Sequence, residues 1–398
     1  MTPLLWRLLA GRSFAAFATA LIPTTLTLAV VGTGSAADLG IVLACELLPM
    51  LVLLPVAGVA ADRFPARRVV LAADLVRAAA QAAIGAVLLT GGVRVPELAA
   101  LAAVTGAAVA FGTPSARTLV AAVTAEHELL RVNARLGVAG GLAQIAGPAA
   151  AGTLTLAVGA GWSSLLTAAL FTLSALTLGG LPVRTAPPAA RAPFGAELRA
   201  GWSEMRRHPW FMANVAAHAV WHLAAGLLLT LGPLIAVQSL GGEGSWVIVA
   251  QTGTVAMLVG VWAAGRLPVR RPLHAVGIGA AAQALALTAF ALRLPLPATA
   301  AAYGCAMFGL GVLSPLWETE MQRRIPREAL GRVSSFDLLI SFAARPAGLA
   351  LAAPLAGVTG TTAPLLVAAV LTAGANLGVL LLPDVRAVAE RRTPAALQ

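Results

Sequence analysis

The sequence contains no lysine, a single tyrosine and only two cysteines among its 398 residues. Charged residues make up 11% of the chain, whereas a soluble domain carries about a quarter, so this shortage argues against a water-soluble protein. The 59% of apolar residues excludes a disordered chain. Cys45 and Cys305 are too few for a disulfide scaffold, and their spacing does not suit a metal.

Motifs of enzyme chemistry are missing as well. The chain has no phosphate-binding P-loop, no nucleophile elbow and no zinc-protease motif. We therefore predict neither direct use of ATP nor an enzyme, and no cofactor or metal. Abundant alanine and arginine without lysine are typical of a bacterial genome of high GC content.

Long apolar stretches dominate what is present, and mean hydropathy is +0.87. A membrane-spanning helix needs about 20 mostly apolar residues. These stretches are continuous rather than alternating, which favours helices over a barrel. The sequence thus predicts an all-α membrane protein with twelve transmembrane helices. We expect them at residues 13–33, 38–61, 69–90, 95–116, 132–158, 162–182, 210–238, 244–264, 272–292, 296–316, 333–357 and 361–382.

The positive charges test this assignment. All 27 basic residues are arginines, and the net charge is +11. In a soluble protein such an excess of positive charge would suggest nucleic-acid binding, but here the arginines recur in short groups between apolar stretches. With the predicted spans, 23 of them fall on the N-terminus, the loops after even-numbered spans and the C-terminal tail, counting Arg135 in the first turn of the fifth span. Only Arg94 and Arg293 lie on the opposite side, and Arg77 and Arg345 lie inside spans. The positive-inside rule then predicts that both termini are cytoplasmic.

The two halves of the chain repeat each other. The turn at 62–68 contains Arg63, Pro65, Arg67 and Arg68, and the same residue types return 203 positions later in the turn at 265–271. Pro114 is expected to close the fourth span and Pro315 the tenth. Pro148 and Pro346 interrupt the fifth and eleventh spans. These echoes predict two six-helix bundles, 1–182 and 210–398, joined by a cytoplasmic linker, 183–209.

Two similar bundles suit a transporter, because a site between them opens to either side when the bundles rock. The linker contains several prolines and arginines, and its part from Glu197 to Arg207 is expected to form a short amphipathic surface helix. The second copy of the turn carries Arg266, Pro268, Arg270 and Arg271, but it has Gly265 where the first has Asp62.

The first turn resembles the signature of the major facilitator superfamily between its second and third helices: Gly58, three residues, Asp62-Arg63, then Arg67 and Arg68. Pro65 replaces the second glycine of that motif, and Ala66 replaces a basic residue. Within the superfamily the chain is most similar to the bacterial branch that includes macrolide and enterobactin exporters. The resemblance implies the two-bundle fold, a substrate site between the bundles and transport by alternating access.

The resemblance also implies a cytoplasmic gate. We expect the anionic Asp62 at the N-terminal end of the eleventh span, near Arg332, because that end of a helix carries partial positive charge. Arg63 is expected to meet Asp337, Glu318 or Glu320. The alternative is that these charges only set topology and a tight turn. The predicted gate residues are Gly58, Asp62, Arg63, Arg67, Arg68, Arg266, Arg270, Arg271 and Asp337.

The fifth span resembles the glycine- and proline-containing motif of the superfamily's antiporters, although alanines replace some of its positions. A second interpretation is ordinary close packing of small residues in an alanine- and glycine-rich chain. The motif residues are Gly137, Gly141, Gly147, Pro148 and Gly152.

Polar groups within spans need an explanation, because an ionisable group there is costly. Glu46 is a candidate for proton coupling or a hydrogen-bonded helix contact. Asp74 and Arg77 share one helix face, where they can neutralise each other as a structural pair near the cytoplasmic edge. The alternative is that they are candidates for proton coupling or line the cavity. Arg345 is expected to bind an anionic group or to pair with Glu46 or Asp337.

A polar stripe follows the seventh span at intervals of four residues, which places its members on one face of the helix. It begins with Asn214, His218 and His222. Histidine titrates near neutrality, so these residues are candidates for proton relay or substrate contact, with hydrogen-bonded packing as the alternative. A metal site is not predicted, because no third ligand is evident.

Together these features predict a proton-coupled efflux transporter of the cell membrane. Its substrate would be a hydrophobic or amphipathic small molecule, its partners would be substrate, protons and the lipid bilayer, and it would act as a monomer without nucleic acid. One alternative is an importer or symporter on the same fold. Alternatives of another class are a membrane-embedded enzyme and a transport-inactive accessory protein.

Overall fold

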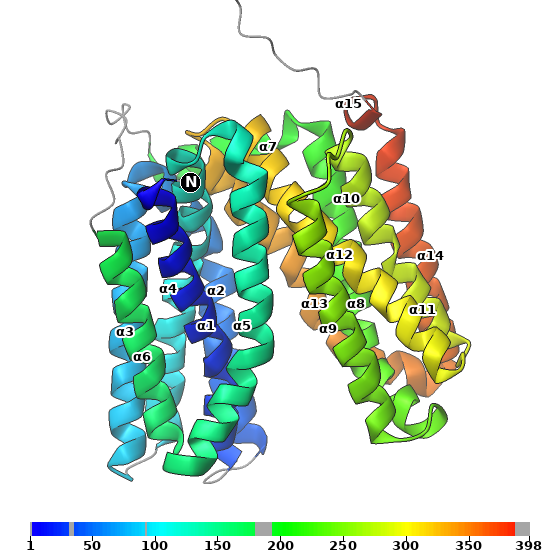
Figure 1. Cartoon of the computed structure of the whole chain (residues 1–398), viewed down its shortest axis with the longest axis horizontal. Helices are drawn as coiled ribbons and strands as arrows, with labels where there is room; N and C mark the ends of the chain where they lie inside the picture. Colours follow the sequence, from blue (N-terminus) through cyan, green and yellow to red (C-terminus); the bar gives the residue numbers. More distant parts are fainter. Residues whose placement is uncertain (1, 32–35, 92–93, 180–192, 387–398) are drawn as a thin grey trace, which may run out of the picture. The chain divides into compact units, whose positions relative to one another are not determined.

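The structure is a computed structural model that describes residues 2–31, 36–91, 94–179 and 193–386. In these ranges the chain is helical and contains no strand (Figure 1). Twelve helices or helix pairs are long and apolar enough to cross a membrane, which confirms the predicted number of spans within the described residues. The fold class is therefore all-α membrane protein, as the sequence predicts.

The helices of the first half are α1 (Pro3–Val31), α2 (Ala36–Arg63), α3 (Ala66–Leu89), α4 (Val95–Val123), α5 (Leu129–Val158) and α6 (Ala160–Gly179). A short helix, α7 (Phe194–Arg206), stands between the halves. The second half contains α8 (Pro209–Ser239), α9 (Glu243–Ala264), α10 (Pro272–Ala281), α11 (Gln283–Ala291), α12 (Leu296–Arg324), α13 (Leu330–Thr359), α14 (Thr362–Gly378) and α15 (Pro383–Arg386).

Several predicted boundaries are wrong. Pro114 and Pro315 lie inside α4 and α12 and do not close them, since these helices continue to Val123 and Arg324. Likewise α1 begins at Pro3, ten residues before the predicted start. A proline within a helix removes only one backbone hydrogen bond, and a helix does not have to end where the hydrocarbon layer ends. The predicted spans, bounded at prolines and arginines, therefore miss the turns that extend these helices.

The chain divides into two compact units, and each unit combines two segments that are separate in the sequence. Unit 1 comprises Met1–Glu204 together with Met321–Leu339, and unit 2 comprises Met205–Glu320 together with Ile340–Gln398. The segment 321–339 thus packs with the first half of the sequence although it lies in the second. We did not expect this from the sequence, which suggested a division at the linker alone. Residues 183–192 of the predicted linker lie outside the described residues, as do Arg391 and Arg392.

Small residues bring the helices of unit 1 close together. The close pairs are α2 with α4, α3 with α6, and α1 with α5 and α6. Where α3 crosses α6, a Cβ added to Gly85 would lie 3.0 Å from the carbonyl oxygen of Gly161, so neither position has room for a side chain. This is the packing mode expected of helices in lipid, where close backbone contact replaces the hydrophobic effect.

The core of unit 2 forms around α8, α11 and α14. Leu228, Leu231, Phe290 and Leu365 are almost completely buried there. Many leucine and valine side chains on the outer faces of the helices remain exposed, for example Val255 on α9. Apolar side chains on the outside are ordinary for helices whose surroundings are lipid rather than water.

Candidate functional site

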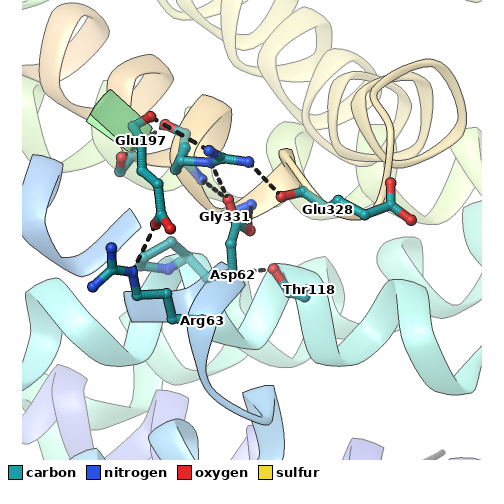
Figure 2. A network of polar contacts seen from close by, with 9 residues as sticks. Asp62, Arg63, Thr118, Glu197, Glu328 and Gly331 are labelled. Atoms are coloured by element: carbon teal, nitrogen blue, oxygen red, sulfur yellow. Dashed lines mark hydrogen bonds and ion pairs between the residues drawn. The ribbon is translucent and has the colours of Figure 1, made fainter. Parts of the chain in front are cut away.

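The C-terminal end of α2 holds the start of α13 through Asp62. Asp62 Oδ1 accepts a hydrogen bond from the Gly331 N–H at 2.7 Å, and Oδ2 accepts one from the Arg332 N–H at 3.1 Å (Figure 2). Arg332 Nε donates a third to Oδ2 at 2.7 Å. The side chain of Asp62 is only 6% exposed. Because the first N–H groups of a helix lack intrahelical partners and carry partial positive charge, a carboxylate fits this position.

Two glycines allow α2 and α13 to approach this closely. A Cβ added to Gly58 would overlap the side chain of Ser335. A Cβ added to Gly331 would lie 2.5 Å from Asp62 Oδ1 and 2.9 Å from the carbonyl oxygen of Gly58. The close packing of α2 against α13 therefore explains why the motif has glycine at position 58. Gly331 was not among the predicted site residues, because a single glycine just before the predicted span 333–357 carries no specific signal.

The linker helix α7 contacts both α2 and α13 next to Asp62. Arg63 Nε donates to Glu197 Oε2 at 2.7 Å, and Arg332 Nη1 donates to the Glu197 carbonyl oxygen at 3.4 Å. Further along α7, the Trp202 ring meets Phe336 of α13 edge to face at 5.7 Å between centroids. We call these three contacts the α7 clasp. A helix over Glu197–Arg207 was predicted, but its role against α2 and α13 was not.

The clasp gives Arg63 an acid partner, Glu197, that was not among the three expected from the sequence, Asp337, Glu318 and Glu320. Asp337 accepts a hydrogen bond from Arg117 Nη1 of α4 at 2.9 Å. From the sequence, Arg117 was expected only to set topology. Spacing along the chain does not reveal such pairs, because their members lie more than 130 residues apart.

Further contacts hold the segment 321–339 within unit 1. Asn133 Nδ2 of α5 donates to Gln322 Oε1 at 2.8 Å, and both residues are buried. Arg323 Nη2 donates to the carbonyl oxygen of Glu126 at 3.2 Å. Together with the Asp62 contacts, the Arg117–Asp337 bond and the α7 clasp, these bonds join the segment to α2, α4, α5 and α7. We call the whole set the 321–339 junction.

The remaining predicted gate arginines have other surroundings. Arg67 Nη1 donates to the Gly179 carbonyl oxygen at 3.1 Å, and Arg68 is exposed. Arg266 lies over the ring of Trp262, 4.2 Å from its centroid. In the described residues, the side chains of Arg270 and Arg271 form no hydrogen bond or ion pair, and both residues are exposed.

Asp74 and Arg77 form a buried ion pair on α3, as predicted. The structure adds three groups that the sequence did not reveal. Ser174 Oγ of α6 donates to Asp74 Oδ2 at 2.7 Å, and Arg12 Nη1 of α1 lies 3.5 Å from the same oxygen. The Arg77 guanidinium also lies over the Phe171 ring at 4.4 Å. This set joins α1, α3 and α6, which favours a structural role for Asp74.

Glu46 and Arg345 differ from Asp74, because each is half-buried and its side chain has no hydrogen bond or ion pair in the described residues. Glu46 belongs to α2 in unit 1, where its backbone carbonyl touches Gly106 of α4. Arg345 belongs to the unit 2 part of α13. A pair between Glu46 and Arg345 stays a prediction.

The polar stripe on α8 meets aromatic rings within unit 2. Asn214 Nδ2 donates to the Trp210 carbonyl oxygen at 2.7 Å. The His218 ring meets Trp317 of α12 edge to face at 4.9 Å, and the His222 ring lies 4.3 Å from that of Phe342 on α13. Histidines set among aromatic rings provide both apolar contact and hydrogen bonds, which suits an amphipathic ligand.

The glycines of the α5 motif are not equivalent. A Cβ added to Gly147 would lie 2.5 Å from the Ala20 side chain of α1, so this position serves close packing. No atom lies within 4 Å of a Cβ added to Gly152. Gly141 is buried and Gly137 half-buried, and Pro148 lies inside the helix without ending it.

These features define the class of protein: a polytopic helical membrane protein in which a segment of the second half is bound to the first. The sequence profile of the Major Facilitator Superfamily matches residues 8–349. The chain therefore belongs to this superfamily, and it is a multi-pass membrane transporter that handles small molecules rather than an enzyme.

Comparison with known proteins agrees with this family. The chain is 29% identical over 369 residues to the multidrug efflux pump Tap of Mycobacterium tuberculosis, covering 89% of this chain and 87% of the pump. It is 28% identical over 347 residues to Tap of Mycolicibacterium fortuitum, covering 84% of each.

Solved structures of low identity share the fold. A bacterial homologue of the iron transporter ferroportin, in an outward-facing state, aligns with a TM-score of 0.75 at 19% identity, covering 95% of this chain and 99% of that one. The fucose:proton symporter of E. coli aligns with a TM-score of 0.76 at 13% identity, covering 94% and 97%.

Proposed function

We propose that this transporter exports a hydrophobic or amphipathic small molecule, driven by the proton gradient, by alternating access, and that both termini are cytoplasmic. The direction and substrate class are supported by the similarity to the Tap multidrug efflux pumps along most of both chains. The orientation is supported by the arginine distribution, since 23 of 27 arginines fall on one side of the predicted topology.

The observation that carries the mechanism is the capping of α13 by Asp62. Three hydrogen bonds from Gly331 and Arg332 converge on one carboxylate that is nearly buried. Such a contact stabilises one state of a two-state protein and is lost in the other. We infer that the 321–339 junction is the gate on the arginine-rich side, closed in this structure and opened when the segment leaves α2, α4 and α7.

Proton coupling is assigned to Glu46. A coupling carboxyl must exchange protons during the cycle, so a group without a permanent partner suits the role. Glu46 has no hydrogen bond or ion pair in the described residues, whereas both oxygens of Asp74 are engaged by Arg77 and Ser174. Asp74 and Arg77 therefore hold α1, α3 and α6 together in this proposal.

Substrate contact is assigned to one face of unit 2. His218, His222 and Phe342 come from α8 and α13, and Trp317 comes from α12. Arg345 is half-buried on α13, three residues after Phe342. Aromatic rings beside titratable groups bind amphipathic molecules through apolar surface and a few polar contacts.

Transport in everted membrane vesicles tests the direction. Wild-type everted vesicles with an acidic interior should accumulate a fluorescent amphipathic drug. Collapsing the pH gradient should release the drug. A panel of compounds in an efflux-deficient host, comparing wild type with Asp62→Asn, then narrows the substrate class. Asp384→Asn is the matched control, because Asp384 is exposed and forms no ion pair in the described residues. Depletion of the drug from energised everted vesicles would instead identify an importer.

A further inference from the structure

The turn between α9 and α10 presents arginine and apolar side chains together. Trp262 is 52% exposed and Leu267 57% exposed, and Arg270 and Arg271 are exposed beside them. The guanidinium of Arg266 makes a cation–π contact with Trp262, 4.2 Å from the ring centroid. We call Trp262, Arg266, Leu267, Arg270 and Arg271 the Arg266 turn.

The equivalent turn of the first half uses its arginines inside the protein. Arg63 pairs with Glu197, and Arg67 donates to the Gly179 carbonyl oxygen. The acid of that turn, Asp62, caps α13. In the second half Gly265 replaces this acid, but the three arginines are kept.

The arginines of the Arg266 turn have no counter-charge in the described residues. None of the three side chains forms an ion pair there, and Arg266 has only its contact with Trp262. Asp384 is the acid on α15, a helix that packs against α10, yet it forms no ion pair with them in the described residues. Three positive charges at one turn are therefore left without a counter-charge among the described residues.

The position of the turn indicates which partner would balance these charges. It directly follows α9, which is long and apolar enough to cross a membrane, and precedes α10, which forms such a span together with α11. Exposed tryptophan is typical of the membrane–water interface, and guanidinium groups bind phosphate oxygens in a two-pronged geometry. We propose that the Arg266 turn binds the headgroup phosphate of an anionic phospholipid, with Trp262 and Leu267 against its glycerol and upper acyl chain.

Each element of the turn has a part in this binding. Trp262 holds the Arg266 guanidinium in place before the lipid arrives, which lowers the entropy lost on binding. Arg270 and Arg271 supply the charge that distinguishes an anionic lipid from a zwitterionic one. The inference concerns lipid binding only, so it does not depend on the proposed direction of transport or on the gate.

Native mass spectrometry of the full-length protein in detergent tests the proposal, with phosphatidylglycerol titrated against phosphatidylcholine. The variant R270Q/R271Q is compared with R391Q/R392Q, which removes the same charge from the C-terminal tail. Each arginine near an anionic headgroup changes affinity by roughly fivefold, so we expect roughly 25-fold weaker phosphatidylglycerol binding for the first variant. The tail variant should bind like wild type.

A second variant and a second anion complete the test. R271Q leaves two arginines to fix the topology and should lose roughly fivefold, so a failure of the double variant to insert does not stop the experiment. Equal phosphatidylglycerol binding by R270Q/R271Q and R391Q/R392Q would show that these arginines only orient the chain, and the proposal would be wrong. Displacement of the lipid by millimolar inorganic phosphate would also overturn it, because the turn would then be a site for soluble anions.

Discussion

Asp62 and Arg332 are joined by two hydrogen bonds to one carboxylate oxygen, one from the backbone N–H of Arg332 and one from its Nε. The same arginine therefore provides both the helix end and the side chain that hold Asp62. A neutral amide at position 62 would keep the shape but lose the charge that makes both bonds strong.

The variant Asp62→Asn should transport at least about tenfold more slowly than wild type, because a hydrogen bond to a charged group contributes about 1.5–3 kcal/mol. Initial rates of drug accumulation in everted vesicles measure this loss. Asp384→Asn, which removes an exposed carboxylate without a pair in the described residues, should leave the rate unchanged. Equal rates for Asp62→Asn and wild type would remove Asp62 from the gate.

The variant Gly331→Ala should separate α2 from α13, since the added methyl group would lie 2.5 Å from Asp62 Oδ1 and 2.7 Å from the Ala61 side chain. A reporter cysteine at the buried Ser335, in a chain without Cys45 and Cys305, measures the separation by its rate of reaction with a polar thiol reagent. We expect faster labelling than in the parent. Gly374→Ala is the control, because a Cβ there meets no atom within 4 Å. Similar labelling in all three proteins would contradict the close approach.

The variant Glu197→Gln should weaken the α7 clasp by removing the ion pair with Arg63. The two side chains of the pair, Arg63 and Glu197, are 24% and 14% exposed, so solvent screens the pair and only a small loss of transport rate is expected. A cycle of Arg63→Gln, Glu197→Gln and the double variant, read from transport rates, should show that the double variant is no worse than the single ones. Fully additive losses would mean that the two residues act separately.

Two matched carboxylate-to-amide changes separate structure from coupling. Asp74→Asn leaves Arg77 and Arg12 beside a neutral group, and breaking a buried ion pair costs about 3–5 kcal/mol, so thermal unfolding in detergent should begin at a clearly lower temperature. Glu46→Gln should unfold like wild type, because its carboxyl has no partner to lose in the described residues. Unfolding of both variants at the wild-type temperature would disprove the structural role of Asp74.

The same Glu46→Gln protein should lose proton-driven accumulation while it still exchanges substrate across the membrane. An amide at this position cannot release a proton, but it leaves α2 and its contact with Gly106 intact. Counterflow in proteoliposomes measures exchange, and accumulation under an imposed pH gradient measures coupling. Wild-type accumulation by Glu46→Gln would assign coupling to another group.

Much of the fold could be predicted from the sequence, because hydropathy and arginine placement are set by the bilayer itself. The twelve spans, the position of Asp62 at the start of α13 and the Asp74–Arg77 pair all follow from local physics. The partners found for Arg63 and Asp337 do not. Nothing in the sequence marks Glu197 as the partner of Arg63 or Arg117 as the partner of Asp337. Only the three-dimensional packing of α7 and α4 brings each pair together.

Helix ends were predicted less well than helix centres. The parts of α4 and α12 that extend beyond the predicted spans carry Arg117 and Arg323, which reach Asp337 and Glu126. A prediction that ends each helix at the edge of its apolar stretch removes these turns and the contacts with them. Several contacts of the 321–339 junction lie in those extensions.

One continuous helix belongs to both units. Helix α13 runs from Leu330 to Thr359, with its first ten residues in unit 1 and the remainder in unit 2. Arg332 and Arg345 are thirteen residues apart on it, about 20 Å at 1.5 Å per residue. A displacement of its first turn is therefore transmitted along the helix axis to the level of Arg345. Pro346 is the position at which this helix bends at the lowest cost in free energy.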